Sequence, residues 1–221
     1  MELVILLTCS LRDSNSTFGN RAPHRRVKVG LMSTTIRCPW VDLSKPDYIR
    51  YHDLEWGVPV RDDRTQFEFL LLESAQAGLS WYTVLKKREN YRLAFAGFDP
   101  EMVARFGDDE LESMMQNAGL IRNRAKLKAA INNAQRFLAV PDEFGNFCNY
   151  IWDFVDGEPK INAPRNATEI PVTSKESDAL SKDLKKRGFT FVGLTIIYAH
   201  LQATGLVNDH TLDCFRRVEL L

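Results

Sequence analysis

The stretch DELESMMQNAGLIRNRAKLKAAINNAQRFL, residues 109–138, decides the fold that we predict for this chain. A first helical segment runs to Met115, and Gly119 then interrupts the pattern. A second segment begins after Asn123, whose side chain is a good helix cap. Its apolar residues fall on one helical face, namely Leu127, Ile131, Ala134 and Leu138. We therefore expect two helices joined by a glycine-containing turn.

The same stretch carries a run of positive charge. No acidic residue occurs from Ser113 to Pro141, whereas the basic residues there are Arg122, Arg124, Lys126, Lys128 and Arg136. Backbone N–H groups at the start of the second helix, together with these cations, would form a phosphate-binding site. A solvated helix face would carry the same charges, so the sequence alone leaves both interpretations open.

Outward from this hairpin, the chain from residue 38 consists of further short helices with recognisable ends. The expected N-caps are Asp62 or Asp63, Ser80, Asp99 before Pro100, Asp142 and Thr173 with Glu176. The expected helix ends are Gly78, Gly107, Gly119, Gly157, Gly188 and Gly205. The proline-bearing stretch 158–172 is expected to be a loop. No long alternating strand is present, so we predict one all-α domain over residues 34–221, with the hairpin at about 109–138.

Length and composition exclude several classes of protein. Of the 221 residues, 44% are apolar and 26% are charged, which is ordinary globular usage and not that of a disordered, collagen-like or cysteine-rich chain. A chain of this size forms a core without disulfides. The cysteines at positions 9, 38, 148 and 214 are widely spaced, which indicates a reducing compartment with thiols or metal ligands.

Lys and Arg together number 29, as do Asp and Glu, but the charge is unevenly distributed. Residues 1–37 carry a net charge of +4, which leaves −4 for residues 38–221. Any nucleic-acid binding must therefore come from local patches.

The first 33 residues show no helical or strand periodicity. The apolar run Leu3–Leu7 is too short to span a membrane, and no basic segment precedes it as in a secretory signal. We expect residues 1–33 to be a disordered extension or the product of a mis-assigned start, with Met32 beginning the functional protein. We therefore expect neither secretion nor a membrane partner.

The spacing His210-x-x-x-Cys214 suggests a metal site. On a helix, residues four apart share a face, with Cβ atoms about 5–6 Å apart, which suits two ligands of tetrahedral zinc. Cys38 and His52 are the candidates for the other two positions. Four such ligands leave no open position, so the ion would be structural. The alternative is a buried cysteine beside a surface histidine, which the spacing alone does not exclude.

Glu73 lies within FLLLESA, residues 69–75, a run that is apolar nearly all round. A carboxylate there cannot easily reach water, and burying it is costly unless it is paired or used. The aromatic residues expected nearby are Tyr48, Tyr51, Trp56 and Trp81. They would line a slot for a flat ring whose edge the carboxylate contacts. A partly exposed glutamate and an ordinary aromatic core are the alternatives.

These segments together resemble the 3-methyladenine DNA glycosylase I family, a part of the helix-hairpin-helix superfamily. The motifs that carry the resemblance are RCPW (37–40), YHDLEWGVP (51–59), QAGLSW (76–81), LKKRENY (85–91), ALSK (179–182), LKKRGF (184–189) and GLVNDH (205–210). They occur in order at family-like spacing over about residues 36–217, and residues 1–33 lie outside them.

The resemblance implies an all-α helix-hairpin-helix fold that excises alkylated bases from DNA. It implies one structural Zn²⁺ that joins the two ends of the domain, with the ligands Cys38, His52, His210 and Cys214. It implies a catalytic carboxylate at Glu73 and a pocket wall of Tyr51 and Trp81, with Tyr48 and Trp56 close by. The implied DNA-binding residues of the hairpin are Gly119, Arg122, Arg124 and Lys126.

The activity that follows is hydrolysis of the N-glycosidic bond of 3-methyladenine in double-stranded DNA by a monomer. The target nucleotide must leave the stack, at a cost of a few kcal/mol. Methylation at ring nitrogen 3 makes the purine cationic and therefore a good leaving group. An aromatic face attracts that cation, and Glu73 favours it. The rival function is a non-catalytic, zinc-stabilised helix-hairpin-helix DNA-binding module, which needs no buried Glu73.

Overall fold

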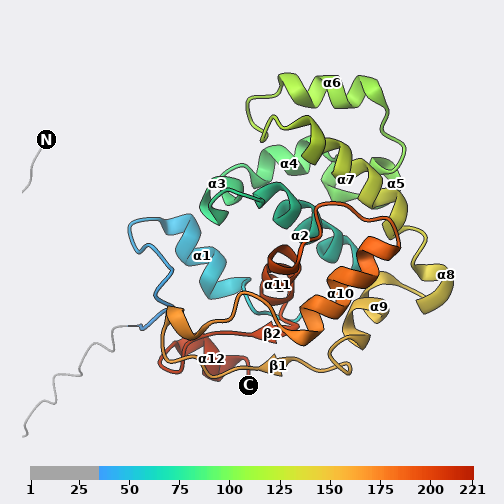
Figure 1. The fold of residues 1–221 in the computed structure, drawn as a ribbon. Helices are drawn as coiled ribbons and strands as arrows, with labels where there is room; N and C mark the ends of the chain where they lie inside the picture. The colour runs from blue at the N-terminus through green and yellow to red at the C-terminus, as the bar shows by residue number, and fades with distance from the viewer. Residues whose placement is uncertain (1–34) are drawn as a thin grey trace, which may run out of the picture. The chain divides into compact units, whose positions relative to one another are not determined.

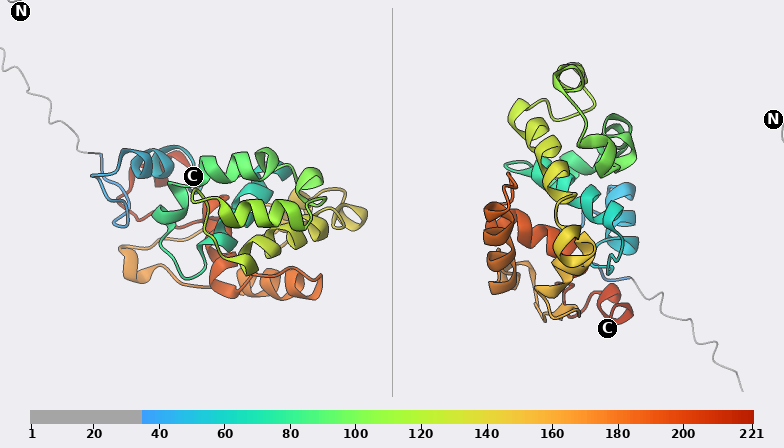
Figure 2. Two further views of the ribbon diagram at one scale, coloured as in Figure 1. Left: turned by 90° about the horizontal axis from the view of Figure 1, so that it is seen from above. Right: turned by 90° about the vertical axis from the view of Figure 1, so that its right-hand side faces the viewer.

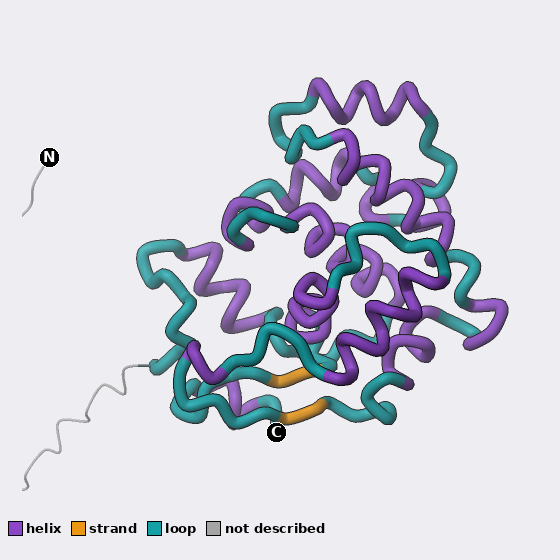
Figure 3. Tube along the Cα trace, viewed as in Figure 1, coloured by secondary structure: helices purple, strands orange, loops and turns teal. Residues whose placement is uncertain are grey.

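Helices are the main elements of residues 35–221, the part of the chain that a computed structural model describes as one unit (Figures 1 and 3). The expectations for residues 1–33 lie outside the described residues. The helices of the first half are α1 (Pro46–Leu54), α2 (Asp63–Gln76), α3 (Trp81–Leu85), α4 (Arg88–Ala94), α5 (Pro100–Val103) and α6 (Asp108–Gln116). Those of the second half are α7 (Arg124–Phe137), α8 (Pro141–Phe144), α9 (Phe147–Asp153), α10 (Lys175–Lys186), α11 (Leu194–Ala203) and α12 (Phe215–Glu219). Two 3₁₀ turns cover Ala96–Phe98 and Ala167–Glu169.

Helix α2 is the central element of the unit. Every residue from Gln66 to Ala75 is buried, because the helix is apolar on nearly all sides and must be covered all round. It packs against α3, α7, α9 and α11. A carboxylate placed in the middle of this helix is therefore enclosed by protein.

Two apolar clusters flank α2. The larger contains Phe67 and Phe137, whose ring centroids are 5.3 Å apart. This cluster also includes residues of α9, α10 and α11. The smaller contains Cys38, Tyr51, Trp56, Phe69 and Cys214. Trp81 packs against both clusters, so it stands at the boundary between the general core and the region of the chain ends.

The predicted hairpin is present as α6, a turn and α7. Asn123 caps α7, since its side chain accepts a hydrogen bond from the Lys126 backbone N–H at 3.2 Å. In Figure 1 and in the right-hand view of Figure 2, α6 lies at one end of the unit and α12 at the other. The hairpin is thus distant from the region where the chain ends.

A short parallel pair, β1 (Lys160–Ile161) and β2 (Val207–Asn208), is the strand structure of the described residues (Figure 3). Lys160 pairs with Val207 and Ile161 with Asn208. The pair falls partly within the expected loop 158–172 and ties that loop to the segment after α11. No helix within residues 35–221 is both long and apolar enough to cross a lipid bilayer.

Several predicted helix ends are confirmed. Asp62 accepts a hydrogen bond from the Thr65 N–H at 2.8 Å, and Ser80 caps α3 through Thr83. Asp99 caps α5, with Pro100 as its first residue. These caps are local interactions, and the sequence therefore reveals them.

Other boundaries differ from the prediction, by between one residue and a full turn. Gly107 is the N-cap of α6 and not the end of α5, and Ser174 caps α10 in place of Thr173. The single helix expected after Asp142 is two helices, because Gly145 adopts a φ of 81° and Asn146 caps α9 afresh. The expected helix through His210 and Cys214 is absent: this stretch is irregular, and Cys214 is instead the N-cap of α12.

Candidate functional site

A cavity of about 400 Å³ lies beside α2. Aromatic side chains supply much of its wall, namely Trp40, Tyr48, Tyr51, Trp56, Trp81 and Tyr198. The polar lining residues are Glu73, Gln76, Thr195 and Gln202, and the segment 170–172 closes part of the rim. All five residues predicted for a pocket are thus among those that line this cavity.

The aromatic wall is held by mutual packing. The ring centroids of Tyr51 and Trp81 are 5.2 Å apart. The ring of Phe69, on α2, is stacked with that of Trp81 at a centroid distance of 6.5 Å. The ring centroid of Trp40 lies 5.1 Å from that of Tyr48 and 5.0 Å from that of Trp56. A slot with rigid aromatic faces can hold a flat ring at little entropic cost.

Glu73 is the acidic residue of the cavity wall. Its side chain is 3% exposed, and its Oε2 has no hydrogen-bond partner among the described residues. Burial raises the pKa of Glu73 to about 8, because the charged form loses its hydration. At neutral pH the protonated form of this carboxyl is therefore favoured.

Four further residues line the cavity that were not predicted from the sequence, namely Trp40, Gln76, Tyr198 and Gln202. Trp40 follows Cys38 closely, and its indole N–H is buried without a partner among the described residues. Tyr198 and Gln202 lie on α11, whose apolar character suggested only core. No local pattern marks Trp40, Tyr198 and Gln202, since they meet α2 only through the tertiary fold, whereas Gln76 is the last residue of α2 itself.

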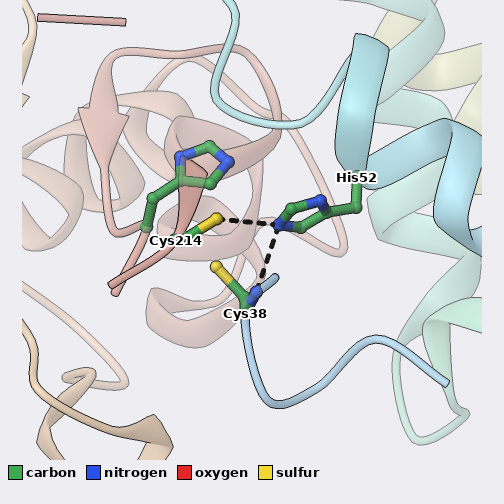
Figure 4. Close-up of side chains that lie close together, drawn as sticks. Cys38, His52 and Cys214 are labelled. Carbon is green, nitrogen blue, oxygen red and sulfur yellow. Dashed lines mark hydrogen bonds between the residues drawn. The ribbon is translucent and has the colours of Figure 1, made fainter. Parts of the chain in front are cut away.

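A second cluster adjoins the aromatic wall. The ligand atoms of Cys38, His52, His210 and Cys214 all lie within 4.8 Å of one another, and all four residues are buried. The Nε2 atom of His52 lies 3.4 Å from the Cys214 Sγ (Figure 4). A tetrahedral ion with bonds of about 2.0–2.3 Å separates its ligand atoms by roughly 3.3–3.8 Å, so the arrangement suits one four-coordinate metal ion.

The hydrogen bonds around this cluster orient both imidazoles toward its centre. The Nδ1 of His52 donates to Asp53 at 2.7 Å, and Arg37 holds the same carboxylate through two nitrogens. The Nδ1 of His210 donates to Asn208 at 3.0 Å, so its buried Nε2 is left without a partner among the described residues. Such outer partners are typical of metal-binding histidines.

The thiol pair and the backbone also suit a metal. The Cys38 thiol donates a hydrogen bond to Cys214, which lowers the pKa of Cys214 and raises the pKa of Cys38, so Cys214 is the first of the two to form the thiolate that binds metals. Gly57, with a φ of 79°, lets the His210 ring approach closely, because a Cβ there would lie 2.6 Å from the His210 Cε1. The residues present therefore fit a metal ion.

The four residues expected to bind DNA occupy different environments. Arg122 is exposed, and Arg124 is exposed but paired with both carboxylate oxygens of Glu112. Lys126 is buried, and its Nζ donates to the Ala75 and Ala77 carbonyls at 2.8 and 2.5 Å. This side chain points into the protein, where it caps the end of α2, so the expectation that it contacts phosphate is wrong.

The LKKRENY motif holds the turn of the hairpin. The Tyr91 hydroxyl accepts from the Ile121 N–H at 3.2 Å, and Lys87 donates to the Ala118 carbonyl at 2.8 Å. A Cβ at Gly119 would lie 2.6 Å from the Asn90 Cγ, so only glycine fits against α4. The role of Gly119 in the turn is thus close packing.

Comparison with known proteins agrees with these features. The family model for methyladenine glycosylase matches residues 40–217. The chain is 51% identical over 178 residues to DNA-3-methyladenine glycosylase 1 of Escherichia coli, covering 80% of this chain and 95% of that protein. It is 50% identical over 180 residues to DNA-3-methyladenine glycosylase of Haemophilus influenzae, covering 81% and 97%.

Solved structures give the same result. A crystal structure of 3-methyladenine DNA glycosylase I superimposes with a TM-score of 0.79 at 52% identity, covering 81% of this chain and 98% of that one. A variant of 3-methyladenine DNA glycosylase I in complex with 3-methyladenine superimposes with a TM-score of 0.76 at 38% identity, covering 78% and 93%. With an aromatic cavity, a buried carboxyl and this extent of similarity, the chain belongs to the methyladenine glycosylase family.

Proposed function

We propose that this protein hydrolyses the N-glycosidic bond of 3-methyladenine in alkylated DNA, releasing the free base and leaving an abasic site. Membership of the methyladenine glycosylase family supports this activity. The observation that carries the proposal is the buried Glu73 carboxyl in the wall of an aromatic cavity, with no hydrogen-bond partner for its Oε2 among the described residues. A DNA-binding module would gain nothing from this costly arrangement.

The cavity would receive a base that has left the DNA stack. The faces of Trp81 and Tyr51 stack on a cationic purine, an attraction of roughly 0.5–2 kcal/mol. Burial favours the protonated form of Glu73, but a cationic ring beside it would lower its pKa, so that the carboxyl would give its proton to water and the carboxylate would pair with the ring. Neutral adenine cannot make this pair, so selection rests on the charge of the damaged base.

Water would attack the sugar once the base departs. No lysine is among the described residues that line the cavity. We therefore assign hydrolysis alone, without a Schiff-base step that would cut the DNA strand. Glu73 would act by stabilising positive charge on the ring as the glycosidic bond lengthens.

We infer that the ion of the cysteine and histidine cluster is one zinc. Two thiolates and two imidazoles are ligands that zinc prefers, and four protein ligands leave no open position. When bound, zinc would supply a structural link and no reaction chemistry. Cys38 and His52 would hold it from the start of the domain, and His210 and Cys214 from its end.

We further propose that the α6–α7 turn is a helix-hairpin-helix that binds double-stranded DNA. Arg122 and Arg124 would contact phosphates there, as would the free N–H groups at the start of α7. Lys126 would instead support the loop after α2. The protein would act as a monomer wherever genomic DNA lies.

Release of bases from methylated DNA tests the proposed activity directly. The purified protein is incubated with methylated duplex DNA, and the released bases are identified by chromatography. We expect 3-methyladenine from the wild type. Trp81→Ala should release it about ten- to a hundredfold more slowly, because a stacking face is lost. The affinity of Trp81→Ala for undamaged DNA should remain unchanged, and failure of the wild type to release any base would leave the DNA-binding module as the function.

A further inference from the structure

A buried carboxylate behind the cavity organises part of its wall. Asp209 is 0% exposed and accepts three hydrogen bonds from side chains. Tyr198 OH and Gln202 Nε2 donate to its Oδ2 at 2.6 and 2.7 Å, and Asn162 Nδ2 donates to its Oδ1 at 2.7 Å. Two of these donors, Tyr198 and Gln202, line the base cavity.

This network determines which end of the Gln202 amide faces the cavity. A carboxylate only accepts hydrogen bonds, so Gln202 must turn its NH₂ group toward Asp209. The amide oxygen, Oε1, then points away from Asp209 and makes no hydrogen bond to any residue of 35–221. If the amide were reversed, two acceptors would face each other at about 2.7 Å, which is strongly unfavourable. Because Gln202 lines the cavity and Asp209 holds its NH₂ group, the amide oxygen is the polar group that Gln202 can present to a bound base.

We propose that Gln202 is a specificity-determining residue, which accepts a hydrogen bond from an N–H donor of the bound base, and that Asp209 is the positioning residue that fixes its polarity. The inference rests on the proposed function of the cavity. A purine with an exocyclic amino group, such as 3-methyladenine, can donate a hydrogen bond to Oε1 of Gln202. A purine with a carbonyl oxygen at that edge, such as 3-methylguanine, would face it with a second acceptor.

Inhibition by free bases tests this role separately from catalysis. Release of 3-methyladenine from DNA is measured with added free 3-methyladenine or free 3-methylguanine, and the inhibition constants are compared. In Gln202→Met, which keeps the length of the side chain but has no amide, inhibition by 3-methyladenine should weaken roughly three- to tenfold. Inhibition by 3-methylguanine should stay the same or strengthen, because the opposing acceptor is gone.

The role of Asp209 is tested by a double-mutant cycle. Asp209→Ala frees the amide, so selectivity between the two bases should fall, and adding Gln202→Met should lower it no further. Asn162→Ala is the matched control: it removes a donor from the same carboxylate without touching Gln202, so it should lower the melting temperature and leave selectivity unchanged. Metal content and melting temperature are measured for each variant.

Two outcomes would overturn the inference while leaving the proposed function intact. One is an unchanged selectivity in Gln202→Met. The other is an equal loss for both bases, which would indicate a general packing role or a role in orienting water. Failure of the wild type to release any base would instead overturn the proposed function itself.

Discussion

Glu73 lowers the stability of the fold at a position where the proposed function requires a buried carboxyl. Its carboxyl is buried, lacks a hydrogen bond from Oε2 to any described residue, and has its pKa raised to about 8. The unfolded chain would release this proton near pH 4.5. Between these two values the folded protein holds a proton that the unfolded chain has lost, so the stability of the fold must decrease as the pH rises.

Glu73→Gln should remove this pH dependence. We expect the free energy of unfolding of the variant, minus that of the wild type, to grow between about pH 5 and pH 8 and to level off above. The full difference should be on the order of a few kcal/mol, given 1.4 kcal/mol per pKa unit. Denaturant unfolding at a series of pH values measures it. Glu101→Gln, at an exposed position on α5, is the control and should follow the wild type. A constant difference across the range would contradict the assigned pKa.

At the level of elements, the hairpin is bonded to the end of α2, which helps to form the cavity wall. Lys126 of α7 caps the end of α2, directly before the QAGLSW loop that leads to Trp81. Lys87 and Tyr91 of α4 hold the turn from the other side. If the hairpin moved on binding DNA, the loop at the edge of the cavity would therefore shift as well.

Changing Arg122 and Arg124 together to Ala should weaken binding to all duplexes alike. Each lost phosphate contact lowers the slope of log affinity against log salt by about 0.9, so the pair should lower it by up to about 2. Arg124 contributes only if it exchanges Glu112 for a phosphate, which is feasible because the pair is exposed. Fluorescence anisotropy at several salt concentrations gives the slope. Lys182→Ala, at an exposed position on α10, is the control. A loss limited to one DNA sequence would contradict a backbone contact.

At the scale of the whole molecule, the cysteine and histidine cluster joins the two ends of the domain. Cys38 precedes α1 and Cys214 precedes α12, and the Phe215 N–H donates to the Ile36 carbonyl at 3.0 Å beside them. Trp56 packs on the His210 ring at 4.5 Å and also lines the cavity. Loss of an ion here would therefore loosen the aromatic wall as well as the chain ends.

We expect one zinc per chain, and chelation should lower the melting temperature. Structural zinc contributes on the order of 10–16 kcal/mol in small peptides, so the effect should be large. Elemental analysis and melting with and without chelator measure it. Cys214→Ser should lose the metal, whereas Cys148→Ser, a buried cysteine outside the cluster, should keep it. Wild-type protein without zinc, and with a melting temperature that a chelator does not change, would contradict the assignment.

A chain that starts at Met32 should keep full activity. The family model begins at residue 40, and the compact unit begins at residue 35. The shortened chain therefore keeps every residue of the cavity, the cluster and the hairpin. Base release and melting temperature are compared with those of the full chain. A shortened protein that folds but releases no base would show that residues 1–31 contribute to the reaction.

The sequence by itself determined the features that depend on neighbours along the chain. Asp62, Ser80 and Asn123 cap helices as predicted, because each side chain bonds to the backbone three residues ahead. The buried Glu73 was also predictable, since an acid within an unbroken apolar helix has no route to water. The cluster residues were identified by type and family motif, but not by the helix expected at His210, which does not form.

Only the tertiary structure decided the features that join distant segments. The direction of Lys126 depends on carbonyls about fifty residues earlier, so its charge alone suggested the wrong partner. The polarity of Gln202 depends on Asp209, which follows β2 and bonds back to α11. A hydrogen bond between distant segments does not change the sequence pattern of either segment. Each side chain fits its own helix or loop in more than one orientation, so the local sequence does not reveal which partner it bonds.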